Sequence, residues 1–340
     1  MRVAVVGVGL VGASVGLAAK ARLGAAVVGV DPDPGAALAA GAIDAAAPLE
    51  QALDGADAAF VAVPVAALAD TVRSVLDAAP PACAVTDVGS VKRPVVEAIA
   101  DERFVGGHPL AGGVASGASH ARADLFEGAT WYLTPSRASA GLRLQELHRL
   151  ISALGARPAI IDAATHDRAM AAVSHLPHVL ANVLALGARD ALGDAPADGW
   201  VGPSFRDATR VAGANPELWA QIYAANADAL VDAIDGAIAR LADVRGALEA
   251  GEGLRGWQGQ AAAARAGAGG EHAELRMAVP NRPGVLADVA LTLAREGINI
   301  GDMSLAPSPD MATGALSIWV AADRAPRAVE LLAGLGLSAA

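Results

Sequence analysis

The residue best suited to proton transfer is His108, which lies between two glycines and a proline in RFVGGHPLAGG, residues 103–113. A neutral imidazole with a pKa near ~6.5 can accept a proton at physiological pH, as a general base does. Ser90, in TDVGSVK (residues 86–92), is a second polar residue at the end of an apolar run. By themselves these residues could also be a turn histidine and an ordinary helix N-cap, so their surroundings must decide.

Three further residues have side chains that could bind a ligand. Arg210, in FRDATRVA, has the planar fork of donors that suits a carboxylate, although an arginine on a helix is usually solvated surface. His175 and His178 lie three residues apart in SHLPH, but no third ligand with suitable spacing accompanies them. We therefore predict no metal site.

The stretch GVGLVG contains Gly7, Gly9 and Gly12 in the pattern G-x-G-x-x-G, directly after the strand-like run RVAVV. Asp31 ends the next such run, at about the 20-residue spacing of a dinucleotide-binding unit. The glycines would allow a tight turn, close approach of a pyrophosphate and close helix packing; the alternative is a glycine turn without a nucleotide. Because the Asp31 carboxylate would bind ribose hydroxyls and repel a 2′-phosphate, we predict NAD. The predicted NAD contacts, which include the end of the later run FVAVP, are Gly7, Gly9, Leu10, Val11, Gly12, Asp31, Val63 and Pro64.

Four segments position these residues. Residues 1–162 alternate Val/Ala/Ile runs with helical patterns, which predicts an NAD-binding domain with a doubly wound, Rossmann-type parallel α/β sheet. Residues 163–252 lack strand signals and predict an all-helical substrate and dimerisation domain, with a long second helix capped by Asn215. Residues 253–271, rich in Gly and Ala, predict a linker. Residues 272–340 show strand, helix, strand, strand and helix, which predicts a small α+β domain of split β-α-β type.

Composition and charge narrow the class of protein. The formal net charge is −11 and no run of Lys or Arg occurs, so nucleic acid is not an expected partner. The N-terminus lacks the pattern of a signal peptide, and no stretch approaches the ~20 unbroken apolar residues of a membrane span. The single cysteine, Cys83, suits a reducing compartment. We expect a cytoplasmic protein whose partners are small molecules or its own copy, and no membrane.

In their order along the chain, the glycine loop, TDVGSVK, GGHPLAG, SHLPH and FRDATRVA resemble the prephenate and arogenate dehydrogenase family of tyrosine biosynthesis, over residues 1 to about 250. The tail, with VPNRPGVLADV and GINIGDMSL, resembles an ACT domain. The resemblance implies NAD-dependent oxidative decarboxylation of prephenate to 4-hydroxyphenylpyruvate. The alternatives are an arogenate dehydrogenase that forms tyrosine directly, and a sensor of NAD and an amino acid without turnover. A β-hydroxy acid dehydrogenase is disfavoured because it would use a lysine in the second domain, and residues 163–250 contain none.

The resemblance also implies roles for the residues introduced above. His108 matches the catalytic histidine that accepts the hydrogen bond, and then the proton, of the substrate 4-hydroxyl. Ser90 matches a serine that bonds the same hydroxyl and steadies His108. Arg210 matches an arginine that grips a substrate carboxylate. Trp219, in PELWAQIY, is expected to pack between helices.

Few residues indicate which substrate side chain the enzyme accepts. His178 is placed at the substrate or subunit boundary, with Asp167 and Asp207 as partners that orient it or Arg210; a core or interface histidine is the alternative. Many relatives have Thr and Glu where this chain has Gly113 and Val114, in the loop that borders the substrate side chain. Gly113 is thus a predicted substrate contact, and the choice between prephenate and arogenate stays open.

In the tail, residues that match the amino-acid-binding loops of ACT modules predict a site for tyrosine as end-product inhibitor. A purely structural or dimerising tail is the alternative, because the C-terminus leaves only a stub for a last strand. A homodimer is expected through the helical domain. The predicted effector contacts are Asn281, Pro283, Gly284, Leu286, Asn299 and Ile300.

Overall fold

A computed structural model of the chain describes residues 1–111, 117–193, 202–267, 272–280, 285, 288–289, 292–293, 296, 298, 300–308 and 312–338. The chain divides into two compact units, Met1–Ala239 and Arg240–Ala340. The predicted contact Gly113 lies outside the described residues, as do the effector contacts Asn281, Pro283, Gly284, Leu286 and Asn299.

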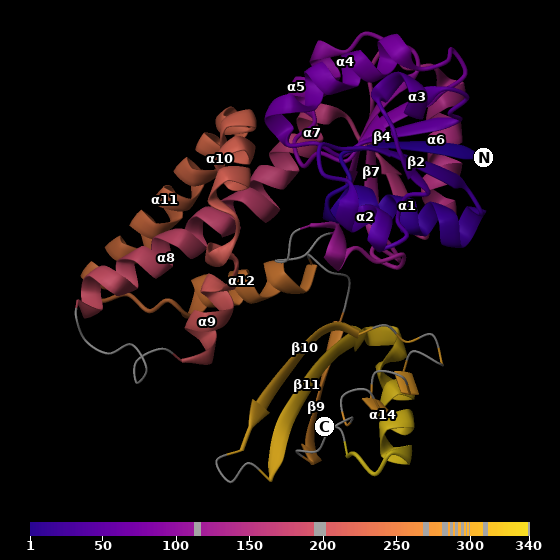
Figure 1. Cartoon of the computed structure of the whole chain (residues 1–340). Coiled ribbons are helices and arrows are strands. Elements are labelled where there is room, and N and C mark those ends of the chain that lie inside the picture. Colours follow the sequence, from indigo (N-terminus) through magenta and orange to yellow (C-terminus); the bar gives the residue numbers. More distant parts are fainter. Residues whose placement is uncertain are drawn as a thin grey trace. The chain divides into compact units, whose positions relative to one another are not determined.

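The first unit is built on an eight-stranded sheet of order β3-β2-β1-β4-β5-β6-β7-β8 (Figure 1). Its strands are β1 (Arg2–Val6), β2 (Ala26–Val30), β3 (Ala45–Ala46), β4 (Ala58–Val61), β5 (Ala84–Asp87), β6 (Phe104–Pro109), β7 (Thr130–Pro135) and β8 (Arg157–Ile160). The predicted Rossmann-type sheet is confirmed, but the expectation that it is parallel throughout is wrong at one pair. Strands β6 and β7 are antiparallel. Among the described residues between them only the short 3₁₀ turn Ala118–His120 forms, and an antiparallel neighbour needs no crossover helix.

Helices cover both faces of this sheet (Figure 1). They are α1 (Leu10–Leu23), α2 (Gly35–Ala39), α3 (Leu49–Leu53), α4 (Leu68–Ala78), α5 (Arg93–Ala98) and α6 (Gly141–Ala153). Residues of α1, α2 and α6 share one apolar core with the sheet, and residues of α3, α4 and α5 share a second core on the opposite face. Because the central strands are buried on both sides, their sequences are nearly continuous apolar runs.

A helical region follows the sheet and comprises α7 (Ala163–Met170), α8 (Leu176–Leu192), α9 (Pro203–Thr209), α10 (Pro216–Ala225) and α11 (Ala227–Glu249). A π-helical turn, Ala171–His175, joins α7 to α8. The predicted cap is confirmed, since the Asn215 side chain accepts a hydrogen bond from Leu218 N at 3.2 Å. The predicted single second helix is instead two helices separated at Asn226. The side chain of Asn226 is buried at this break, and its amide donates a hydrogen bond to Asp167 O at 2.8 Å.

The joined helix Ala163–Leu192 is long and apolar enough to cross a membrane by length and composition alone, whereas the sequence was expected to contain no such segment. Its apolar run is interrupted by ionisable residues. His166, Asp167, His175 and His178 are buried, and all four make hydrogen bonds within the first unit. Only 28% of the most apolar window of this helix is buried within the structure.

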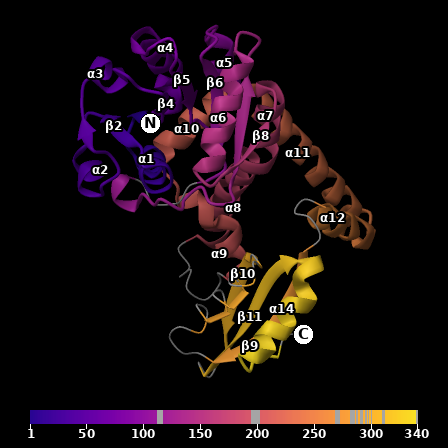
Figure 2. The ribbon, with the colours of Figure 1, turned by 90° about the vertical axis from the view of Figure 1, so that its right-hand side faces the viewer.

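The second unit contains a three-stranded antiparallel sheet of order β10-β11-β9, with α14 along one face (Figure 2). Its elements are the helix α12 (Arg255–Gly267), the strands β9 (His272–Pro280), β10 (Ile300–Pro307) and β11 (Thr313–Ala321), and the helix α14 (Ala325–Gly334). The small α+β domain is thus confirmed, and Ile300 begins its strand β10. The segment predicted as a linker, 253–271, contains the exposed helix α12.

Candidate active site

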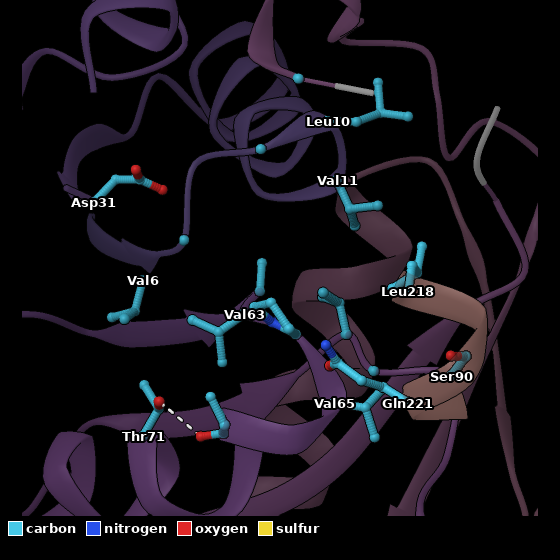
Figure 3. A pocket seen from close by; sticks show the side chains of 18 of the residues that line it. Val6, Leu10, Val11, Asp31, Val63, Val65, Thr71, Ser90, Leu218 and Gln221 are labelled. Atoms are coloured by element: carbon cyan, nitrogen blue, oxygen red, sulfur yellow. Dashed lines mark hydrogen bonds between the residues drawn. The ribbon is translucent and has the colours of Figure 1, made fainter. Parts of the chain in front are cut away.

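A cavity of about 1400 Å³ opens beyond the carboxyl ends of β1, β4 and β5. Ligands of open α/β sheets bind at this edge. In Figure 3, Asp31 lies on one side of the cavity and Ser90 and Leu218 on the other. The cavity brings together most of the residues predicted to bind NAD or take part in catalysis: Gly7, Gly9, Leu10, Val11, Asp31, Val63, Pro64, Ser90 and His108.

The glycine loop has the shape that a pyrophosphate requires. Gly7 has φ +88°, and a Cβ there would lie 2.5 Å from the carbonyl oxygen of Ala62. A Cβ on Gly12 would lie 1.9 Å from the carbonyl oxygen of Gly7, so α1 packs directly on the loop. A Cβ on Gly9 would meet nothing within 4 Å, so the space over the N-terminus of α1 is open. An anion can approach the helix N-terminus there.

Asp31 is held against this loop by main-chain donors. Its carboxylate accepts hydrogen bonds from Val8 N at 2.8 Å and from Asp33 N at 2.9 Å. The acceptor oxygens suit two ribose hydroxyls, and the neighbouring Asp33 adds a second negative charge that would repel a 2′-phosphate. The residues present therefore fit NAD.

His108 lies on β6, opposite Tyr132 of β7, so the alternative of a turn histidine is wrong. The two glycines before it allow close packing within the sheet. A Cβ on Gly107 would lie 2.4 Å from the carbonyl oxygen of Asp87 and 2.6 Å from Thr86 Oγ1. The strand therefore presents His108 to the cavity from a close-packed backbone.

The imidazole of His108 is joined to two residues that were not predicted to contact it. His108 Nδ1 lies 2.9 Å from His166 Nε2, and His166 Nδ1 lies 2.8 Å from Asp167 Oδ1. Burial above all, with the positive charge of the nearby Lys92, holds the pKa of His108 well below its ordinary value. The ring is therefore neutral at physiological pH and able to accept a proton.

A buried ion pair lies beneath the segments that carry Ser90 and His108. Lys92 Nζ donates to Asp87 Oδ2, and both side chains are 0% exposed. Asp87 also accepts from Gly89 N at 2.8 Å and from Gly107 N at 3.0 Å. Because these glycines precede Ser90 and His108, one carboxylate fixes the backbone beside both residues.

Ser90 is half-buried in the cavity wall. The alternative that it caps a helix is wrong, because α5 begins at Arg93 with Lys92 in the N-cap position. The first turn of α5 is instead capped from a distance. Asp167 accepts from Lys92 N and from Arg93 N, each at 2.8 Å.

Asp167 has other partners than His178 and Arg210, and two predicted substrate contacts lie outside the cavity wall. Asp167 was expected to orient one of these two residues, but its carboxylate contacts His166 and the N-terminus of α5. Asp207 is exposed on α9, and Arg210 is exposed in the 3₁₀ turn after it. Neither lines the cavity.

His178 and Trp219 form a stacked pair in which only Trp219 lines the cavity. Their ring centroids lie 3.6 Å apart with an interplanar angle of 6°. His178 Nδ1 is hydrogen-bonded to the hydroxyl of Tyr223, and burial lowers the pKa of His178. Trp219 packs between helices, as predicted, and also lines the cavity, which its sequence context did not indicate. Helix α10 therefore forms one wall of the site, with Leu218 and Gln221 beside Trp219.

Acid is expected to destabilise this region through His175. Burial lowers the pKa of His175 to about 4, although Asp167 opposes the shift, and Asn226 Nδ2 donates to its Nδ1 at 3.2 Å. Because the folded pKa lies below the unfolded value of ~6.5, the stability is complete above ~6.5 and declines as the pH falls toward about 4.

The melting temperature, measured by circular dichroism, is expected to fall between pH 6.5 and 4. His175→Gln, which keeps an acceptor for Asn226 but cannot be protonated, should flatten part of that decline. An equally steep decline in the variant would contradict this role.

Three known families match successive parts of the chain. The family described as prephenate dehydrogenase, nucleotide-binding domain, matches residues 15–160, and the prephenate dehydrogenase dimerization domain matches residues 162–255. A third family, the AHAS small subunit-like ACT domain, matches residues 275–333.

Individual relatives give the same result. The chain is 28% identical to prephenate dehydrogenase of Bacillus subtilis, over 93% of this chain and 91% of that protein. It is 31% identical to cyclohexadienyl dehydrogenase of Zymomonas mobilis, over 74% of this chain and 89% of that protein.

Two solved structures are also similar. Prephenate dehydrogenase from A. aeolicus, in complex with hydroxyphenyl propionate and NAD+, has a TM-score of 0.71 and 28% identity, and the match covers 78% of this chain and 97% of that chain. Synechocystis arogenate dehydrogenase has a TM-score of 0.63 and 29% identity, with 73% and 92% covered.

Proposed function

This chain belongs to the prephenate dehydrogenase family, and we propose that it oxidises prephenate with NAD, releasing CO2 and 4-hydroxyphenylpyruvate. The observation that carries the proposal is that His108, which is hydrogen-bonded to His166, lines the same cavity as the glycine loop. That loop is open at Gly9, where the pyrophosphate of NAD would approach. A base beside a hydride acceptor is what oxidation of a hydroxyl-bearing carbon requires.

In the proposed mechanism, NAD bound over the glycine loop supplies the acceptor for hydride from C4 of prephenate. His108 accepts the proton of the 4-hydroxyl as the hydride leaves. The bond between C1 and the carboxylate then breaks, its electron pair enters the ring to make it aromatic, and the proton returns to the phenol oxygen. Ser90 donates a hydrogen bond to the 4-hydroxyl oxygen and fixes its position beside His108.

The carboxylates of prephenate need a cationic partner, and the described wall of the cavity contains no arginine or lysine. We propose Arg210 for this role. The 3₁₀ turn that contains Arg210 leads directly to Ala214, which lines the cavity, and this closeness along the chain supports the role. His178 would act through Trp219, Asp207 through Arg210, and Gly113 would border the substrate side chain.

We also propose a homodimer through the helical region, and tyrosine binding by the ACT-like domain. Large apolar side chains are exposed on α8, where 57% of Val183 and 52% of Leu186 are accessible. This exposure in the region that matches a dimerization domain supports a subunit contact. Light scattering that shows only monomers would contradict the dimer.

Asp31 is expected to set the preference for NAD. Replacing it with asparagine removes the charge that repels a 2′-phosphate and one of the acceptors for the ribose. We expect Asp31→Asn to raise KM for NAD by about 10-fold, in line with the loss of a charged hydrogen bond, and to narrow the ratio of kcat/KM between NAD and NADP. An unchanged ratio in initial-rate assays with both cofactors would remove Asp31 from cofactor selection.

The function itself is tested by NADH formation with prephenate and with arogenate, each measured with and without tyrosine. We expect turnover of prephenate and inhibition by tyrosine. Turnover of arogenate alone would reassign the substrate, and insensitivity to tyrosine would overturn the regulatory part. Calorimetric binding of NAD without turnover of either substrate would indicate a sensor and contradict the enzymatic proposal.

A further inference from the structure

We propose that His166 and Asp167 are positioning residues that fix His108 in the tautomer with its proton on Nδ1, which leaves the Nε2 lone pair as the base. The inference rests on the proposed role of His108 and extends it to two residues that do not line the cavity. It follows from the order of donors and acceptors in this buried row of side chains.

Asp167 sets the direction of the hydrogen bonds among these side chains. Its carboxylate accepts from two main-chain donors, Lys92 N and Arg93 N, which are obligatory donors at the first turn of α5. An ionised carboxylate offers only acceptors, so the hydrogen in its contact with His166, at 2.8 Å, must come from His166 Nδ1. The opposite tautomer would place two lone pairs against each other.

The tautomer of His166 in turn fixes the tautomer of His108. A neutral imidazole that donates from Nδ1 accepts at Nε2, and His166 Nε2 lies 2.9 Å from His108 Nδ1. That nitrogen of His108 must therefore be the one that bears hydrogen. The remaining nitrogen, Nε2, is left with its lone pair on the residue of the row that lines the cavity.

Burial and packing keep the row in one arrangement. His166 is 0% exposed, so water does not compete for either ring nitrogen. Its ring packs at 76° against the ring of His108 and at 79° against that of Tyr132, with centroids 5.0 Å and 5.5 Å apart. When His108 takes the substrate proton, the resulting imidazolium donates toward His166, and the Asp167 carboxylate at the end of the row stabilises the positive charge.

The tautomer can be measured without turnover. We would label the full-length protein with 15N-histidine and record long-range 1H–15N correlations at pH 7.5, with His108→Asn to assign the signals. The inference predicts that His108 has a protonated Nδ1 and an unprotonated Nε2. A protonated Nε2 on His108 would overturn it, whatever the activity of the sample.

Two variants of His166 connect the tautomer to the rate. His166→Met removes the acceptor for His108 Nδ1–H within a similar apolar volume, and His166→Gln supplies an amide oxygen in its place. We expect His166→Met to lower kcat by about 10- to 100-fold, the loss typical when the hydrogen-bond partner of a metal-bound histidine is removed. KM for prephenate and KM for NAD should each change by less than about 3-fold. His166→Gln should recover most of the loss. The matched control is His148→Gln, on the exposed face of α6, which should leave kcat unchanged.

The outcomes separate this inference from the proposed function. A wild-type enzyme that is inactive on prephenate and arogenate would contradict the function, while the tautomer measurement would still decide the inference. An active wild type whose His166→Met variant retains full kcat would overturn the positioning role. Equal losses of kcat in the Met and Gln variants, with the Nδ1–H tautomer of His108 retained in both, would also overturn it.

Discussion

His108→Asn lowers kcat for NADH formation from prephenate by roughly 100-fold or more, the usual scale of general-base catalysis. The reason is chemical, since an asparagine amide cannot accept the 4-hydroxyl proton as hydride leaves. KM for NAD should change little because His108 is not part of the glycine loop. The rate should be measured by absorbance of NADH under saturating substrate.

The control for this variant is its fold. Asparagine can still donate a hydrogen bond toward His166 Nε2, so the melting temperature should stay close to that of the wild type. A variant that keeps the wild-type kcat would exclude His108 as the base. A variant with low kcat and a much lower melting temperature would show that the substitution disturbed the strand and would not support the base.

Lys92→Met is expected to destabilise the protein by about 3–5 kcal/mol, because it leaves the Asp87 carboxylate buried without its counter-charge. The measurement is urea unfolding followed by circular dichroism. The activity should fall too, because Asp87 holds the backbone at Gly89 and Gly107, next to Ser90 and His108.

The chain provides a matched control in Lys20, its only other lysine. Lys20 pairs with Asp44 at 2.6 Å, but both side chains are solvent-accessible. Lys20→Met should therefore cost less than about 1 kcal/mol, as exposed ion pairs usually do. If the two substitutions lower the free energy of unfolding by the same amount, the buried pair does not stabilise the site as proposed. Removing both charges, in Asp87→Asn with Lys92→Met, should restore part of the lost stability.

Local patterns made much of the cofactor site predictable. The glycine spacing after an apolar run, with Asp31 at the end of the next run, identifies a loop that the structure builds with an open approach at Gly9. The cap at Asn215 was predictable for the same reason, because a helix N-terminus is specified by adjacent residues.

The inner part of the site was not predictable, because its contacts join residues that are distant in sequence. His108 and His166 are 58 positions apart, and no local pattern specifies that they meet. The adjacent His166 and Asp167 at the start of a helix were the one available signal. Strand direction at β6 and β7 and the break at Asn226 also depend on tertiary packing, which overrides local propensity.

The resemblance placed Arg210 and Asp207 beside the substrate, whereas the structure has Asp207 exposed on α9 and Arg210 exposed in the 3₁₀ turn after it, both outside the cavity wall. Their proposed roles depend on a ligand-bound arrangement of that turn.

The most direct test of the central claim is the stoichiometry of the reaction with prephenate. NADH would be measured by absorbance, CO2 by trapping, and the organic product by mass spectrometry, for the wild type and for His108→Asn. We predict equal amounts of NADH, CO2 and 4-hydroxyphenylpyruvate from the wild type, and at least about 100-fold slower formation of all three by the variant. Formation of no NADH by the wild type, or of NADH without CO2, would contradict the assignment.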